Sequence, residues 1–175
     1  MDYRKSIYFI IALLGVIIYG FNGDQNSTVQ NRLTQSEIDQ GWALLFDGKT
    51  FTGWRSLGRE PVQTDHWKIE EGTIRKVNSN EVPLQADGKP VEGGDLMTIE
   101  AFDNFELSFE WKIKEGGNSG IKYNVSEEMS IANGYKYSAL GFEYQILDDN
   151  SKLYEGKLKP SQYTASLYEM VAPVN

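Results

Sequence analysis

Two segments of the chain, residues 116–125 and 141–148, alternate polar with apolar side chains at a period of two. A strand with this period turns its polar side chains to one face of a sheet. With the polar positions of residues 105–113, the two segments offer a surface of carboxylates, amides and an ammonium group: Glu110, Asn118, Lys122, Glu143 and Gln145. A face of this composition makes a poor core and suits the binding of sugar hydroxyls.

The solvated side of an antiparallel sheet carries similar residues, so each position has a structural alternative. A solvated sheet face is the better interpretation for Glu106, Ser108 and Lys112, and for Glu110 the two interpretations are equally good. It is weaker for Glu143 and Gln145, because an otherwise apolar strand does not need two such residues two positions apart. Lys122 would favour the ionised form of a nearby carboxyl group.

Three further side chains have both a functional and a structural interpretation. Asp148 ends its segment, where it either forms a turn or binds a cation such as calcium at a loop. Trp54 follows a turn, and a half-exposed indole there would contact a sugar, whereas Trp67 and Trp111 fit a core. His66 precedes a predicted strand and is expected to be a solvated loop histidine.

The composition excludes several classes of protein. The chain has 175 residues, a formal net charge of -8 and a sequence pI near 4.7, which disfavours nucleic acid as a partner. It has no cysteine, which rules out disulfides, Cys-zinc sites and a Cys nucleophile. Its single histidine argues against a multi-His metal site or a Ser-His triad. The 17 glycines and 13% aromatic residues favour strands joined by turns.

The N-terminus resembles an export signal. Arg4 and Lys5 precede the apolar run from Ile7 to Tyr19, which is shorter than the roughly 20 residues of a spanning helix. Residues 1–23 are therefore predicted to be a signal peptide, or alternatively an uncleaved N-terminal anchor. Both place the protein outside the cytoplasm: in the periplasm, secreted, or anchored to the inner membrane. Contact with a membrane is expected only through this segment.

The rest of the chain is expected to be a polar linker, residues 24–33, and one domain, residues 34–175. The domain begins with a capping box at Thr34 and Glu37 and a short helix over residues 35–40. Strands are expected at 43–46, at 95–99 and, with strict period two, at 105–113, and a hairpin at 67–77. Residues 78–94 are expected to form a long loop. Strands spaced by turns predict an all-β sandwich or jelly roll.

Six motifs in this order resemble the 3-keto-disaccharide hydrolase domain family, over roughly Gly41 to Asn175. They lie at residues 41–54, 67–72, 95–98, 105–111, 117–121 and 143–148. The resemblance implies a concanavalin A-like β-sandwich. Members of the family commonly extend further than this sequence, so the resemblance also leads us to expect a sandwich that is incomplete at the C-terminus.

The resemblance implies a hydrolase or lyase that cleaves glycosides carrying a ketone at C3. A base removes the C2 proton, the enolate expels the group at C1, and water adds back. Glu143 is expected to be the base or acid and Lys122, or a divalent cation, to stabilise the enolate. Gln145 and Asn118 would orient hydroxyls, and Glu110 would be a second carboxylate or a metal ligand. The expected partner is an oligosaccharide or 3-keto-glycoside.

Other functions stay open on the sequence alone. A non-catalytic carbohydrate-binding module would use the same polar face, and an inactive fragment of a longer enzyme would share the same motifs. Conventional glycoside hydrolysis is less well supported, because the Glu-x-Asp-x-x-Glu pattern of glucanases with this sandwich is missing.

Overall fold

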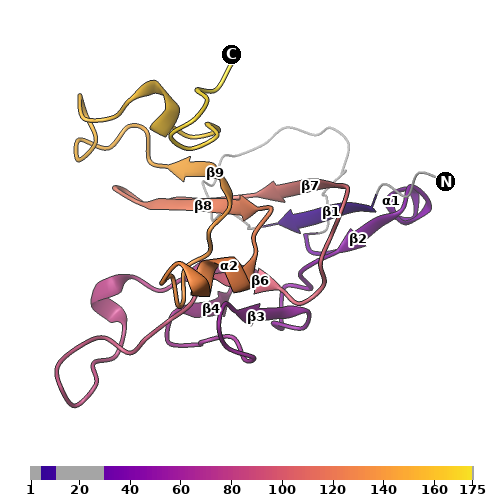
Figure 1. The fold of residues 1–175 in the computed structure, drawn as a ribbon. Coiled ribbons are helices and arrows are strands. Elements are labelled where there is room, and N and C mark those ends of the chain that lie inside the picture. Colours follow the sequence, from indigo (N-terminus) through magenta and orange to yellow (C-terminus); the bar gives the residue numbers. More distant parts are fainter. Residues whose placement is uncertain (1–4, 11–29, 175) are drawn as a thin grey trace, which may run out of the picture. The chain divides into compact units, whose positions relative to one another are not determined.

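The computed structural model describes residues 5–10 and 30–174, and most of its regular elements are strands (Figure 1). Contacts within the chain divide it into two compact units, residues 1–112 and residues 113–175. In unit 1 the elements are β1 (Lys5–Ile10), α1 (Gln35–Asp39), β2 (Trp42–Leu44), β3 (Trp54–Ser56), β4 (Trp67–Glu70), β5 (Thr73–Lys76), η1 (Ser79–Glu81), β6 (Leu96–Thr98) and β7 (Phe105–Glu110).

The strands of unit 1 form three small sheets. Strand β1 pairs in parallel with both β2 and β7, while β3 pairs with β6 and β4 with β5 in antiparallel fashion. Strand β7 ends at Glu110 rather than at the predicted Ile113, and β2 begins one residue before the predicted start. The short strand β3 was not predicted, because three residues are too few to show a period.

The helix α1 confirms the predicted capping box. Thr34 Oγ1 accepts a hydrogen bond from the backbone N of Glu37 at 3.3 Å, and Glu37 Oε2 accepts one from the backbone N of Thr34 at 2.7 Å. The helix ends at Asp39, two residues before Gly41, whose φ of 87° no longer fits a right-handed helix.

The β4–β5 hairpin also forms as predicted. Glu71 and Gly72 have φ values of 51° and 73°, and left-handed residues at both central positions are typical of the tightest hairpin turns. Arg75 holds the two strands together, because its Nε lies 2.6 Å from Glu70 Oε2 and its Nη2 lies 3.1 Å from Glu70 Oε1. This hydrogen-bonded guanidinium lowers the pKa of Glu70.

A hydrophobic core holds the sheets of unit 1 together. Phe46 and Ile74 are its buried centre, and side chains from β3, β4, β6, β7 and the segment between β2 and β3 pack against them: Leu45, Phe51, Trp54, Trp67, Ile69, Leu96, Leu107 and Phe109. The alternation in β7 thus turns Leu107 and Phe109 toward the core, where they are partly buried, as the period-two pattern predicts. Burial of such side chains contributes roughly 1.5–3 kcal/mol each.

The segment predicted to be an export signal lies partly outside the described residues. The part of it that the structure describes, Lys5–Ile10, is the strand β1. Among the residues that the structure describes, no helix is long and apolar enough to cross a membrane. Signal or anchor function therefore stays a prediction from the sequence.

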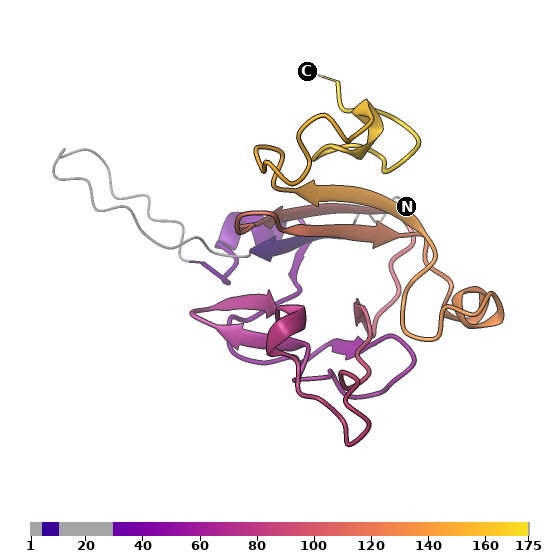
Figure 2. The ribbon, with the colours of Figure 1, turned by 90° about the vertical axis from the view of Figure 1, so that its left-hand side faces the viewer.

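Unit 2 is built around one antiparallel pair. Its elements are β8 (Asn118–Tyr123), α2 (Glu127–Ala132), β9 (Phe142–Leu147) and η2 (Pro160–Gln162). Figure 2 shows β8 and β9 running side by side in opposite directions, with the yellow C-terminal segment following β9. Both strands lie within the segments expected from the sequence.

We expect the Arg75–Glu70 contact to make the stability of the hairpin depend on pH. Because the folded state holds the pKa of Glu70 down, the stabilisation is present above the ordinary range of glutamate and is lost as pH falls through the lower, folded-state value. The difference in urea unfolding between wild type and Arg75→Met should therefore be largest near pH 6 and shrink as pH falls below about 4.

The exposed Lys49 offers a control of the same charge change in unit 1. Lys49→Met should give a difference from wild type that varies far less over this pH range. A difference for Arg75→Met that does not shrink at low pH would show that the contact adds nothing beyond the packing of the arginine stem.

Candidate functional site

Two of the predicted catalytic residues face each other across the β8–β9 pair. The register places Lys122 directly opposite Glu143 and Gly120 directly opposite Gln145. Side chains that are directly opposite in an antiparallel pair point to the same face, with their Cβ atoms about 5 Å apart. By alternation along β8, Asn118 shares this face. We call Asn118, Gly120, Lys122, Glu143 and Gln145 the site face.

The site face is only partly open. Asn118 is exposed, and Lys122 and Glu143 are half-buried. Gln145 is only 3% exposed, and its Oε1 accepts a hydrogen bond from the backbone N of Ile146 at 3.1 Å. The sequence predicted a hydroxyl-binding amide, whereas the structure places this one away from solvent. A direct contact between Gln145 and substrate therefore stays a prediction, and the geometry favours a supporting role.

The side chain of Glu143 lies across Gly120. A Cβ atom built on Gly120 would lie 2.7 Å from Cγ and 2.8 Å from Cδ of Glu143. The carboxylate of Glu143 thus lies over Gly120 on the site face, the face to which the register also assigns Lys122. A half-buried carboxylate next to a lysine is a suitable arrangement for proton transfer to and from a ligand.

The start of β8 is fixed by Asp148. Its Oδ2 accepts a hydrogen bond from the backbone N of Gly116 at 2.8 Å, and its own backbone N donates to the carbonyl of Gly117 at 3.1 Å. The hydroxyl of Tyr154 donates to the carbonyl of Gly116 at 2.9 Å. Gly116 has a φ of 67°, a left-handed backbone conformation that favours glycine at this position.

These contacts bear on the cation predicted at Asp148. Within the described part of the chain, no group of three or more histidine, aspartate or glutamate residues could hold a metal ion. The carboxylate of Asp148 is already engaged with the backbone. The structure thus gives Asp148 a role in shaping the loop, and a cation at this carboxylate stays a prediction from the sequence.

The C-terminal segment completes the outer edge of β9. The backbone N of Gln145 donates to Ser166 O at 3.1 Å, and the backbone N of Tyr168 donates to Glu143 O at 2.9 Å. Thr164 Oγ1 both accepts from the backbone N of Leu147 and donates to its carbonyl, each at 2.9 Å. The sequence did not predict this edge, because residues 164–168 lack the period of a strand.

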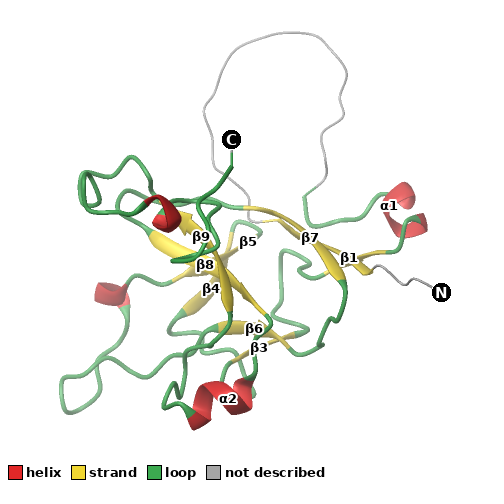
Figure 3. Cartoon of the chain, turned by 45° about the horizontal axis from the view of Figure 1, so that its top comes forward, coloured by secondary structure: helices red, strands yellow, loops and turns green. Residues whose placement is uncertain are grey.

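The connection between β8 and β9 contains α2, which the sequence analysis missed (Figure 3). Ser126 caps the helix by accepting from the backbone N of Met129 at 3.2 Å. The fully buried Ser130 donates to Ser126 O at 2.7 Å and accepts from the backbone N of Leu140 at 2.9 Å. Serine hydroxyls thus tie the helix to the chain entering β9. Ser126 with acidic residues after it was the available signal.

Two predicted binding residues belong to unit 1. Glu110 is exposed at the end of β7. Trp54 packs against the core, and its indole NH donates to the carbonyl of Leu45 at 2.7 Å. This packing explains the position of Trp54 without a ligand. Substrate contact by either residue stays a prediction from the sequence.

The expectation of a solvated His66 is wrong. The ring is half-buried, and its Nε2 donates to the carbonyl of Val91 at 2.9 Å. Its Nδ1 lies 3.1 Å from Nζ of Lys76, which also lies 5.1 Å from the centre of the Trp67 ring. Burial lowers the pKa of Lys76. His66 thus fastens the long loop to the hairpin.

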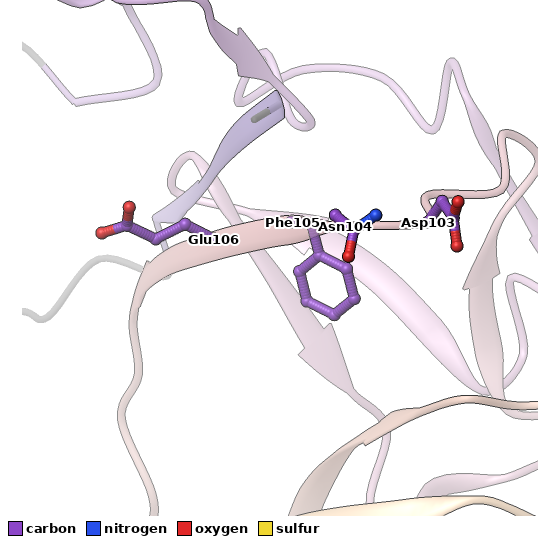
Figure 4. A pocket seen from close by; sticks show the side chains of 4 residues that line it. All are labelled: Asp103, Asn104, Phe105 and Glu106. Atoms are coloured by element: carbon purple, nitrogen blue, oxygen red, sulfur yellow. The ribbon is translucent and has the colours of Figure 1, made fainter. Parts of the chain in front are cut away.

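Unit 1 also has a hollow of about 340 Å³ at the start of β7. It is lined by Asp103, Asn104, Phe105 and Glu106, and Figure 4 shows Glu106 directed away from the other three side chains. None of the residues predicted for the site is among these four. Phe105 is 41% exposed, in contrast to the other two aliphatic or aromatic positions of β7 that pack against the core.

A family model described as a 3-keto-alpha-glucoside-1,2-lyase-like domain matches residues 41–175. The chain belongs to this family. The matched range is the one over which the six motifs resemble the family, and it contains both strands of the site face. The resemblance inferred from the sequence is confirmed.

Two relatives support the assignment. The chain is 41% identical over 143 residues to a 3-keto-disaccharide hydrolase of Bacteroides thetaiotaomicron. The aligned region covers 77% of this chain and 47% of that protein. The chain therefore spans about half the length of this curated relative. A crystal structure of a candidate glycosyl hydrolase from Parabacteroides distasonis matches with a TM-score of 0.57 and 29% identity, over 83% of this chain and 61% of that one.

The expected fold class is also confirmed. The described part of the chain consists mainly of strands with few helices, in agreement with an all-β sandwich, and the solved structure of the similar protein supports it. A fold is shared by proteins of many functions, so the activity has to be argued from the site face itself.

We expect substitutions of Asp148 to separate the loop-shaping role from a cation-binding role. Asp148→Ala leaves the backbone N of Gly116 without its acceptor and should cost about 1–3 kcal/mol in urea unfolding. Asp148→Asn keeps an acceptor oxygen and should retain most of that stability. If Asp148 binds calcium instead, wild type should be more stable than Asp148→Asn only in the presence of calcium. Unfolding in added calcium and in a chelator measures this difference.

Proposed function

We propose that this chain acts in glycan breakdown by cleaving 3-keto-glycosides, through base-assisted elimination followed by hydration. The observation that carries the proposal is the pairing of Glu143 with Lys122 on the half-open site face. Membership of the family supports the substrate class, as does the name of the relative from Bacteroides thetaiotaomicron. The relative is about twice as long as the region compared, so its activity reaches this chain only as part of the proposal.

The first step is removal of the proton at C2 of the sugar. The C3 ketone acidifies this proton, and the Glu143 carboxylate takes it, so the C–H electron pair forms the C2–C3 double bond of an enolate. The negative charge moves to the C3 oxygen. Lys122 stabilises that oxygen, because an ammonium group beside a partly dehydrated oxyanion lowers the energy of the charged intermediate.

The second step breaks the glycosidic bond. As the C3 carbonyl re-forms, the electron pair moves into a C1–C2 double bond and the bond from C1 to the leaving oxygen breaks. The leaving oxygen takes a proton from the carboxyl group of Glu143. Water then adds to C1 and a proton returns to C2, so the net reaction is hydrolysis. One carboxyl group thus serves first as base and then as acid.

The remaining residues of the site face bind and support. Asn118 is exposed and offers an amide donor and acceptor to sugar hydroxyls. Gln145 is enclosed, and it supports β9 through its contact with the backbone N of Ile146. The acidic chain suits a neutral keto-sugar better than a polyanion. The N-terminal segment would place this activity in the periplasm, at the inner membrane or outside the cell.

We expect Glu143→Gln to lower turnover of a 3-keto-glucoside by about 10²–10⁴-fold, because the amide cannot accept the C2 proton. The assay follows release of the aglycone from a chromogenic 3-keto-glucoside, with the unoxidised glucoside as a second substrate. Glu155→Gln, at an exposed position of unit 2, is the matched control and should keep wild-type turnover.

Near-wild-type turnover by Glu143→Gln would contradict the assignment of the base. Binding of the sugar by the wild-type chain without turnover of either substrate would instead favour a carbohydrate-binding module. Turnover of only the unoxidised glucoside would contradict the elimination chemistry.

Substitution of Lys122 should test the stabilisation of the enolate. Lys122→Met removes the charge and should lower kcat by about 10²–10³-fold, whereas Lys122→Arg should retain part of the activity. Both variants should still bind the product sugar, measured by calorimetry, because binding of neutral hydroxyls does not need the charge. A Lys122→Met enzyme with an unchanged kcat would exclude this role.

A further inference from the structure

We propose that Gly120 is a positioning residue: the missing side chain in the middle of β8 leaves the space in which the carboxylate of Glu143 lies. This inference goes beyond the assignment of Glu143 and Lys122, and its catalytic part rests on the proposed function. It assigns to a residue without a functional group the task of orienting the base.

Glycine is an unfavourable choice at this position on local grounds. It lies within a six-residue strand, where glycine is less favourable than alanine and offers no side chain for packing. Its backbone does not require glycine either, because Gly120 is not among the residues with positive φ, unlike Gly116 a few positions earlier. The reason for glycine must therefore lie in the space above its Cα atom.

That space is filled by Glu143. The three heavy atoms nearest to a Cβ built on Gly120 all belong to this one side chain: Oε1, Cγ and Cδ, with the latter two at 2.7 and 2.8 Å. Real Cβ atoms do not approach other atoms so closely, so a methyl group and the present position of Glu143 exclude each other. Register explains the contact, because Glu143 is the diagonal neighbour of Gly120 and leans along β8 from its place opposite Lys122.

The consequence is a fixed direction for the carboxylate. With no side chain at position 120, Glu143 can lie along the site face. With a methyl group there, the carboxylate has to swing away from this seat. A displacement of about 1 Å of a reacting group is enough to lower a rate about 10²-fold.

The first test measures stability and needs no turnover. Gly120→Ala is compared in the wild-type and the Glu143→Ala backgrounds by thermal unfolding. Because Glu143→Ala removes all three clashing atoms, the change in melting temperature caused by Gly120→Ala should be about 2–8 °C less favourable in wild type than in Glu143→Ala, where the melting temperature should stay equal or rise. If Gly120→Ala folds only in combination with Glu143→Ala, this result also supports the inference, because the methyl group is then tolerated only without the Glu143 side chain.

Gly141→Ala is the matched control. Gly141 also lies at ordinary φ, but a Cβ there would meet Tyr123 O at 2.7 Å and Val125 Cγ2 at 2.8 Å, and Glu143 is not involved. Its loss of stability should be the same in both backgrounds. An equal loss for Gly120→Ala in both backgrounds, or unfolding in both, would overturn the inference.

The second test measures the positioning role. Gly120→Ala should lower kcat for the 3-keto-glucoside about 10–100-fold and change KM less than about threefold, because the base is displaced while the binding groups stay. In the Glu143→Gln background the same substitution should cause no further loss of kcat. A wild-type kcat in Gly120→Ala, or an additive loss in the double variant, would contradict positioning through Glu143.

The two tests fail independently. If wild type does not turn over the keto-sugar, the proposed function fails. The stability comparison still decides whether the missing side chain of Gly120 leaves the space that the Glu143 carboxylate occupies.

Discussion

The register of β8 against β9 is the constraint on which the candidate site depends. Lys122 faces Glu143 only because Asn118 is paired with Leu147 and Tyr123 with Phe142. A slip by one residue would turn one strand's polar side chains to the opposite face. The backbone contacts of Asp148 with Gly116 and Gly117 fix one end of the pair. These contacts therefore act on the site through this register.

The rest of unit 2 holds this register with small polar groups. Ser130 ties α2 to the chain that enters β9, and the Thr164 hydroxyl hydrogen-bonds to Leu147 at the outer edge of β9, where the backbone carbonyl of Ser166 also accepts from Gln145. Such bonds contribute about 1 kcal/mol each, but they are directional, so they specify position more strongly than apolar packing does. The core cluster of unit 1 is centred on Phe46 and Ile74, and unit 2 also buries Ile146 and Leu147 of β9. The family assignment spans both units, whereas the proposed chemistry is argued from unit 2.

Features that depend on neighbouring residues were accessible from the sequence. The capping box at Thr34 and the Glu71-Gly72 turn are set by side-chain chemistry and backbone sterics over four residues. The alternation in β7 and β9 follows from the pleat of a strand and predicted which residues share a face. Six short motifs in order also indicated the family, which the matched range confirms. Length limits this reasoning: β3 is too short for a period, and α2 has only six residues.

The sequence by itself determined which side chains share a strand face and where the turn at Glu71-Gly72 lies. It also determined that Glu143 and Lys122 lie on the polar faces of their strands. Only the tertiary structure decided which of these side chains meet. It enclosed Gln145, packed Trp54 against a core and engaged His66 with Val91 and Lys76. It also placed Glu143 over Gly120. The physical reason is that exposure and contact depend on segments distant in the chain, and a local pattern fixes the direction of a side chain but not what it meets.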